Sequence, residues 1–551
     1  MSSNRTSWHC LPPEIQNNII RLLPVLGGRC SRLATVSRDW HSIIEPLNFA
    51  EISLTVPRLA DLSSRAILFR KRSQIRYVWF RVELTQYDCT RCHNTDLAFW
   101  SLDDQFIADA FESLFTTLAA WEPRGNLVLD ISVYSPSDNQ HWFKYLSFRS
   151  DTNLGESSSP RGHEQETTLI NDPAHGWVAG RQVVAPSWYA IEQTFEEIMA
   201  DGPFDEEEPE MQWWRSLPLV PVVGVLLLRQ QTRRRWKPVT LANMLTRFPN
   251  MKELCYEPWR EWERIQPLTD HTTGNQTLIE SLSSTKLCKL VIFENFNESY
   301  PERFTQPPTL REPDPAVSQK LANVSLHLTT LSASFMVDAG FFFAARRDSW
   351  KWEKLTSLVL TSSVLTHDAD TSEINNMLRD AAAAALKMPR LGTMELWNGR
   401  RGVAMLFRYQ RARNGQSVIM TVRGTSDFSL GVAATEAWDM VARRHRHGRV
   451  VVQTSSIDPD VIRCHGDAIL HLGLSTEVVR PVSLRQILSE HGHNAAAASK
   501  EVAPARHVTI AAAQAALDRR LWLTDWRRFV LAEVAAEPAL PQATCAWGIL
   551  S

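Results

Sequence analysis

Two spacings of hydrophobic positions recur along this chain. Near the N-terminus, apolar residues follow the spacing of one helix face: Ile15, Ile19, Leu22 and Leu23. From residue 51 onward, short apolar runs with the composition and alternation of strands appear, such as residues 126–134 and 355–360. Stretches with helical spacing, such as residues 374–386, lie between these runs. The pattern therefore predicts a chain in which helices and strands alternate.

The strand-like runs between residues 211 and 400 form a weak repeat. Their spacing is roughly 29 to 39 residues, longer and less regular than the 20–29 residues of ordinary leucine-rich repeats. A strand–helix unit cannot bury its apolar face alone, so neighbouring units must stack. We expect an α/β fold (α+β overall), with three N-terminal helices followed by an irregular array that resembles leucine-rich repeats, with parallel strands. A single α/β domain without true repeats is the alternative.

Composition and patterning divide the chain into six segments. Residues 151–176 are rich in Ser, Gly, Glu, Asp and Pro and predict a disordered insertion, and residues 201–210 predict a solvated acidic loop. Residues 402–409 and 417–423 predict a hairpin that helps to cover the edge of the sheet. The segments are 1–50, a helical module; 51–150, a linker and the first strand–helix units; 151–210, largely disordered or acidic insertions; 211–400, the array; 401–493, a hairpin and capping α/β segment; and 494–551, a linker and C-terminal helix.

The N-terminal module is small for the apolar surface that it carries. Pro12 and Pro13 suit the first turn of a helix, where a missing N–H removes no intrahelical bond. Ser37 is a plausible N-cap for a third helix, which contains Trp40. Three short helices bury little surface by themselves and are marginally stable without a staple or a partner. The module is therefore predicted to pack against something else.

The motif Leu11-Pro12-x-Glu14-Ile15, the hydrophobic helix after it and Val36-x-x-x-Trp40 together resemble an F-box. In that family the module docks on the Skp-type adaptor of a cullin–RING ubiquitin ligase, and the overall layout is similar to the large fungal F-box families. The alternative is an ordinary helical subdomain of one large fold. The resemblance implies the following adaptor-binding residues: Leu11, Pro12, Ile15, Ile19, Leu22, Leu23, Leu33, Val36 and Trp40.

The composition indicates the cellular compartment and argues against some classes of partner. Of 551 residues, 44% are hydrophobic and 22% charged, and the formal net charge is −2, so no basic excess indicates nucleic acid or an anionic membrane. The apolar run at residues 217–228 contains two prolines and is shorter than the about twenty residues of a membrane helix. No signal peptide is apparent. We expect a soluble protein of the cytoplasm, the nucleus or both.

One short motif carries possible metal ligands. Cys89-Thr90-Arg91-Cys92-His93 matches the haem c attachment pattern, which we discount because it belongs to exported proteins. A structural zinc site needs about four N or S ligands, and Cys89, Cys92 and His93 supply three with no obvious fourth nearby. A zinc site, a redox dithiol and a plain loop all remain open, and the plain loop is favoured. No cofactor is expected.

No familiar catalytic motif is present, so we do not expect an enzyme. Arginine and tryptophan, which are enriched at binding hot spots, cluster near predicted strand ends. Scattered surface residues are the favoured alternative for these clusters. The candidates for substrate binding are Arg233, Trp236, Trp259, Arg346, Arg347, Trp397 and Arg400.

Taken together, the sequence predicts a non-catalytic substrate-recognition subunit of a Skp–cullin–F-box ubiquitin ligase. The N-terminal helices would bind the Skp-type adaptor, and the array would bind a protein substrate whose identity the sequence does not reveal. The receptor would accelerate ubiquitin transfer by raising the effective concentration of the substrate near the ligase, and this chain would perform no chemistry itself. The alternatives are a scaffold that acts outside ubiquitination and a zinc-binding protein centred on Cys89, Cys92 and His93.

Overall fold

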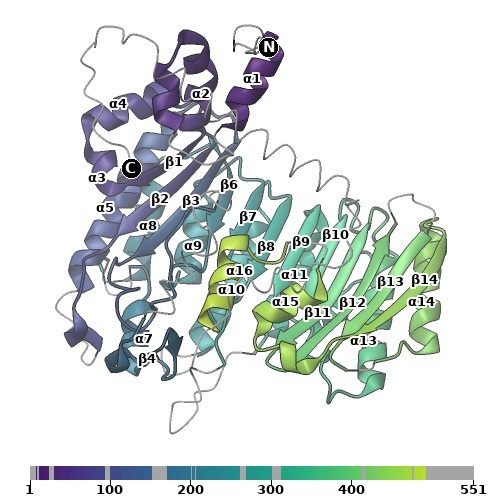
Figure 1. Cartoon of the computed structure of the whole chain (residues 1–551). Helices are drawn as coiled ribbons and strands as arrows, with labels where there is room; N and C mark the ends of the chain where they lie inside the picture. The colour runs from purple at the N-terminus through teal and green to yellow at the C-terminus, as the bar shows by residue number, and fades with distance from the viewer. Residues whose placement is uncertain are drawn as a thin grey trace, which may run out of the picture. The chain divides into compact units, whose positions relative to one another are not determined.

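The computed structural model describes most of the chain and separates it into two compact units. The small unit comprises residues 1–24, 28–45 and 499–551, and the large unit comprises residues 25–27 and 46–498. Within the described residues the fold is mixed α/β, as predicted (Figure 1). The described residues are 8, 11–23, 30–92, 100–151, 170–199, 202–204, 206–260, 268–298, 300, 312–412, 417–426, 428–474 and 477–491.

A 12-stranded sheet forms the large unit, and its strands lie side by side in chain order. All neighbours from β1 to β11 pair in parallel, β11, β12 and β13 pair antiparallel, and β13 and β14 pair in parallel. This sequential order is the strand–helix array that the sequence predicts. The strands are β1 (Glu51–Thr55), β2 (Tyr77–Glu83), β3 (Leu127–Tyr134), β6 (Val223–Leu228), β7 (Glu253–Tyr256), β8 (Lys289–Phe293), β9 (Thr330–Ser334), β10 (Ser357–Thr361), β11 (Thr393–Arg400), β12 (Val403–Arg411), β13 (Ser417–Gly424) and β14 (Arg449–Ser456).

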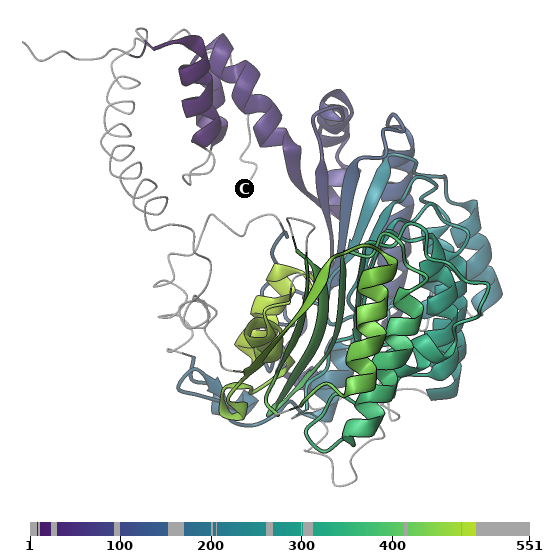
Figure 2. The same cartoon turned by 90° about the vertical axis from the view of Figure 1, so that its right-hand side faces the viewer.

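Connecting helices cover one face of this sheet, and two later helices lie on the other face (Figures 1 and 2). Leu358 and Leu360 of β10 pack in the core cluster that contains the connecting helices, whereas Val359 packs in the cluster of α15 and α16. Burial on both faces explains why strands such as β6, β8 and β10 are apolar at most positions. The connecting helices are α3 (Val56–Ala60), α4 (Leu62–Lys71), α5 (Trp100–Ala119), α8 (Glu207–Ser216), α9 (Pro238–Leu245), α10 (Leu268–Leu282), α11 (Pro315–Val324), α12 (Ala339–Ala344), α13 (Thr371–Ala385) and α14 (Val432–Arg444). The helices on the other face are α15 (His465–Leu472) and α16 (Pro481–Glu490).

Local sequence sets where several of these helices begin. Asp314 accepts a hydrogen bond from the backbone N–H of Val317 at 2.9 Å, and Pro315 occupies the first helical position of α11. Asp61 caps α4 in the same way through Ser64. Aspartate at the cap and proline just inside it satisfy or remove amide donors that have no partner within the helix.

The predicted disordered insertion is partly wrong. Residues 152–169 lie outside the described part of the chain, but residues 170–199 form η6 (Pro173–His175), β4 (Trp177–Val178), β5 (Arg181–Gln182) and α7 (Trp188–Thr194). Trp177, Ile191 and Phe195 of this segment are buried in an aromatic cluster with Trp142 and Tyr300. The sequence prediction rested on the polar average composition and gave no weight to these few large side chains. They supply enough apolar surface to order the segment.

Residues 207–210 of the acidic loop that the sequence predicts at residues 201–210 are instead the first turn of α8. Acidic side chains suit that position because of the helix dipole. Glu210 is buried and accepts hydrogen bonds from Trp214 Nε1 at 3.3 Å and from Thr240 Oγ1 at 2.5 Å. The expectation of a solvated loop is therefore wrong for Glu210.

The C-terminal end of the sheet agrees with the sequence in part. The hairpin of β12 and β13 is confirmed, but the following strand, β14, forms an outer edge of the sheet and is largely exposed. The predicted covering of this edge is therefore wrong for the described residues. The linker and helix expected at residues 494–551 lie outside the described part of the chain. Among the described helices, none has the length and apolar content needed to cross a bilayer.

Candidate functional sites

The small unit contains α1 (Pro13–Leu22), η3 (Cys30–Thr35) and the first part of α2 (Arg38–Ala50). Pro12 stands at the N-cap of α1 and Pro13 at its first position, as the sequence predicts. Ser37 Oγ accepts a hydrogen bond from Trp40 N at 3.2 Å, which satisfies an amide at the start of α2. The local motifs therefore produce the helix starts that they predict.

Among the described residues of this small unit, three buried side chains, Ile20, Trp40 and Ile44, form the core. The Trp8 and Trp40 rings lie 5.6 Å apart, and further apolar side chains are partly buried around them. A core of this size contributes little stability by itself. Trp40, which was expected at the adaptor contact, belongs to the interior.

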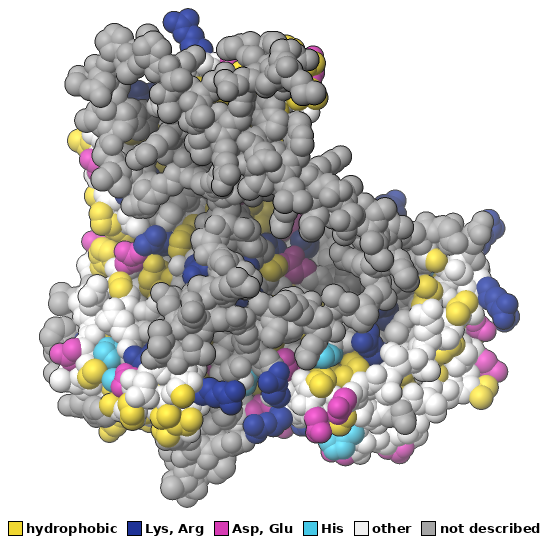
Figure 3. Space-filling model, viewed as in Figure 1, with side chains coloured by type: hydrophobic (Ala, Val, Ile, Leu, Met, Phe, Trp, Pro, Cys, Tyr) yellow, Lys and Arg dark blue, Asp and Glu magenta, His cyan; other side chains and the backbone are white. Residues whose placement is uncertain are grey.

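The other predicted adaptor-binding residues stay at least partly accessible. Ile15 and Leu22 expose 45% and 46% of their surface, and Ile19 is half-buried between them on the same face of α1. Pro12 is also exposed, and the half-buried positions are Leu11, Leu23, Leu33 and Val36. Hydrophobic side chains reach the surface over α1 in Figure 3. α1 thus buries Ile20 on one side and presents an apolar face on another.

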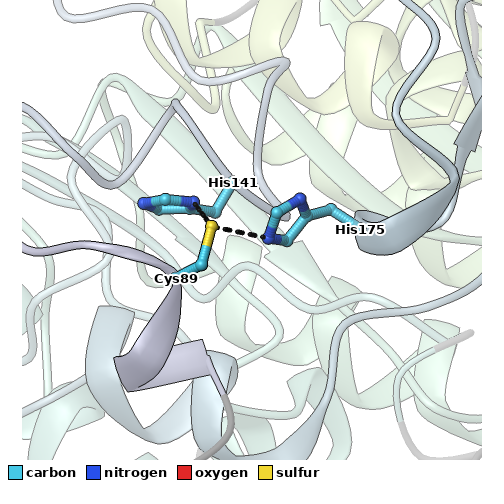
Figure 4. Close-up of side chains that lie close together, drawn as sticks. All are labelled: Cys89, His141 and His175. Carbon is cyan, nitrogen blue, oxygen red and sulfur yellow. Dashed lines mark hydrogen bonds between the residues drawn. The ribbon is translucent and has the colours of Figure 1, made fainter.

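A second site lies in the large unit, in the loops that follow β2 and β3. Cys89 opens η4 (Cys89–Cys92), His141 lies in the turn after β3, and His175 ends η6. His141 Nδ1 lies 3.3 Å from Cys89 Sγ, and His175 Nε2 lies 3.5 Å from the same sulfur (Figure 4). The three potential ligand atoms all lie within 4.8 Å of one another. Parallel strands bring these loops to one edge of the sheet.

Each histidine is oriented by an acceptor at its other ring nitrogen. His175 Nδ1 lies 2.7 Å from Asp172 Oδ2, and Lys144 Nζ lies 3.0 Å from the same oxygen. His141 Nε2 lies 3.4 Å from the carbonyl oxygen of Tyr87, whose ring stacks on the imidazole. The nitrogens that face the sulfur therefore carry lone pairs in the neutral tautomers.

The structure changes the predicted set of metal ligands. Cys89 belongs to the cluster. Cys92 is buried, and among the described residues it is not one of the three whose potential ligand atoms lie within 4.8 Å of one another. Burial raises the pKa of the Cys92 thiol to about 12. His93 lies outside the described residues. The sequence analysis missed His141 and His175 because they follow Cys89 by 52 and 86 residues, and no local spacing links them.

The fold buries some of the predicted substrate-binding residues and leaves others at the surface. Arg233 is buried, pairs with Glu490 at 3.0 Å and lies over the ring of Trp259 at 4.0 Å. Trp259 and Trp397 are also buried, so these three side chains face the interior instead of a partner, which corrects the prediction. The others are Trp236, half-buried against Phe111; Arg346, half-buried; Arg347, exposed beside Trp350; and Arg400, exposed and 4.0 Å from Asp368.

The large unit is thus an array of mainly parallel strands in sequential order, with helices in the connections. Over residues 281–480 the chain is similar to a family of unknown function, DUF6546. The matching segment runs from the end of α10 to the residue before α16 and includes β8 to β14. It contains neither α1 nor the Cys89 cluster. No curated protein matches the chain.

Proposed function

We propose that the protein is the substrate-recognition subunit of a Skp–cullin–F-box ubiquitin ligase. The small unit binds the Skp-type adaptor, and the large unit binds a protein substrate. The observation that carries the proposal is the exposed apolar face of α1, formed by Ile15, Ile19 and Leu22 on a unit whose described part has three buried core residues. Exposed apolar surface of this kind is typical of a protein-binding site.

The size of the contact can be estimated from burial. Full burial of an Ile or Leu side chain is worth about 1.5–3 kcal/mol, so completing the burial of half-exposed Ile15 and Leu22 contributes about 1 kcal/mol each. An aspartate at either position adds the cost of removing a charge from water. Replacing both residues by aspartate should therefore weaken adaptor binding by at least about 30-fold.

The large unit suits a receptor that performs no chemistry itself. Its sequential sheet holds exposed side chains such as Arg347, in the loop after α12, and Arg400, at the end of β11, on a rigid framework. In the proposed function, transfer is accelerated because the receptor raises the local concentration of substrate near the ligase.

The test is the affinity of the full-length protein for a purified Skp-type adaptor, measured by calorimetry. The variant Ile15→Asp/Leu22→Asp should lose binding, whereas Leu62→Asp, on α4 of the large unit, should keep it because Leu62 is 78% exposed and lies outside the small unit. Circular dichroism of each variant verifies that the fold is retained. An unmodified protein that does not bind, or equal binding by both variants, would overturn the proposal.

A scaffold that binds the adaptor outside ubiquitination is the alternative function. Reconstituted ligase with the full-length protein should transfer ubiquitin to a co-purifying protein, and deletion of residues 1–50 should stop that transfer. Adaptor binding without ubiquitin transfer to any co-purifying protein would favour the scaffold.

A further inference from the structure

We propose that Cys89, His141 and His175 form a zinc site. The site is independent of the adaptor-binding face of α1, and it differs from the Cys89, Cys92 and His93 set that the sequence indicates. One thiolate and two imidazoles are ligands that zinc binds in proteins, and an additional group completes its four-coordinate shell.

The separations of the three ligand atoms fit this assignment. Zinc lies about 2.3 Å from sulfur and about 2.0–2.1 Å from nitrogen, so tetrahedral ligands place S and N about 3.5 Å apart. His141 Nδ1 and His175 Nε2 lie 3.3 and 3.5 Å from Cys89 Sγ. All three atoms lie within 4.8 Å of one another, so small side-chain movements bring them to one ion.

Hydrogen bonds alone cannot satisfy both imidazole nitrogens that face the Cys89 sulfur. With the outer ring nitrogens donating to Asp172 and to the Tyr87 carbonyl, both inner nitrogens direct lone pairs toward the sulfur. A thiol has one proton and can donate it to only one of the two imidazoles. A cation at the centre satisfies all three atoms at once.

The outer contacts resemble those that support metal ligands. A histidine that binds a metal usually donates its other N–H to a carboxylate or to a backbone carbonyl. His175 meets Asp172 at 2.7 Å, and His141 meets the Tyr87 carbonyl at 3.4 Å, so each histidine has such a contact. These contacts fix the ring orientations before an ion binds.

A thiol nucleophile is the rival interpretation, because Cys89, His175 and Asp172 form a nucleophile, a base and a group that orients the base. That arrangement needs one base only. In this structure a second imidazole, from His141, lies even closer to the sulfur. The convergence of two histidines on one sulfur favours an ion over a nucleophile.

The location suggests what the ion does. Its ligands come from the loop after β2, the turn after β3 and η6, and η6 belongs to the structured segment 170–199. One ion would join these three pieces of chain beside the aromatic cluster of Trp142 and Trp177. Because the complete ligand set exists only in the folded chain, zinc binding stabilises this region.

The first test measures zinc in the full-length protein by elemental analysis after equilibration with zinc chloride and removal of free metal. About one zinc per chain is expected. Cys89→Ala, His141→Ala and His175→Ala should each lose it, whereas Cys288→Ala, at an exposed free cysteine outside the cluster, should retain it. Cys92→Ala should also retain it, which separates this site from the set that the sequence indicates.

The second test needs no variant and distinguishes a zinc site from a thiol nucleophile. Alkylation of Cys89 by iodoacetamide, followed by mass spectrometry, should be slow in the zinc-equilibrated protein and at least about tenfold faster after chelation, because bound zinc engages the thiolate. Absence of stoichiometric zinc, or zinc loss in Cys288→Ala, would overturn the proposal. Rapid alkylation of Cys89 that is equal with and without zinc would overturn it in favour of the thiol nucleophile.

Discussion

The buried ion pair of Asp130 and Arg229 provides a test of the sheet itself. Asp130 lies on β3 and Arg229 directly follows β6, so the pair joins two neighbouring strands through residues that are 99 positions apart in sequence. Arg229 Nε donates to Asp130 Oδ1 at 3.1 Å, and Nη2 lies 2.5 Å from Oδ2. Both side chains are fully buried, and Tyr77 OH of β2 also donates to Asp130. Three strands therefore depend on one carboxylate.

Removing that carboxylate leaves a buried guanidinium without its counter-charge. Asp130→Ala should lower the free energy of unfolding by about 3–5 kcal/mol, the usual cost of breaking a buried pair. The loss of the Tyr77 hydrogen bond adds about 1 kcal/mol. The double variant Asp130→Leu/Arg229→Met removes both charges while keeping apolar volume, so it should be much closer to the unmodified protein.

Urea unfolding followed by tryptophan fluorescence measures these differences, since the chain contains 20 tryptophans. The comparison of the single with the double variant separates an unpaired charge from a general loss of packing. If Asp130→Ala costs less than about 1 kcal/mol, or if the double variant is as unstable as the single one, the pair does not hold β3 and β6 together as described.

Three further predictions concern other parts of the chain. Trp40→Ala should destabilise the small unit by about 3–5 kcal/mol, because Trp40 packs with Ile20 and Ile44 in its described core; an unchanged thermal transition would contradict this. Gly224→Ala should destabilise the sheet, because a Cβ there meets the backbone carbonyl of Gly125; unchanged urea unfolding would contradict it. Burial raises the pKa of Asp138 to about 6, so its protonation stabilises the fold at low pH, and this contribution is lost as the pH rises through 6. The stability difference between the protein and Asp138→Asn should shift by about 2–3 kcal/mol between pH 4 and pH 7, and a constant difference would contradict it.

Much of the fold could be predicted because its causes are local. Pro13 begins α1 and Ser37 caps α2, since the chemistry of a helix start resides in a few adjacent residues. The strands were recognisable from apolar runs, and parallel neighbours follow from the helices between them. The hairpin of β12 and β13 followed from two alternating runs around a polar turn.

The remaining features depend on distant partners. Arg233 is buried because Glu490, 257 residues away, supplies its counter-charge, and no property of Arg233 or its neighbours reveals that partner. His141 and His175 meet Cys89 because three separate loops reach the same edge of the sheet. Phe195 and Trp177 order a segment whose polar composition indicated disorder. In each case the deciding contact is between residues far apart in sequence.

Hydrogen exchange of the full-length protein, with and without a purified Skp-type adaptor, tests whether α1 completes its hydrophobic contacts on a second polypeptide. We expect slower exchange in peptides that cover residues 11–23 and 33–45 when the adaptor is present, because Ile15, Ile19 and Leu22 become buried. Peptides from β8 to β14 should be unchanged. If exchange in α1 stays the same at saturating adaptor, the exposed face of α1 is not the docking surface and the receptor proposal is wrong.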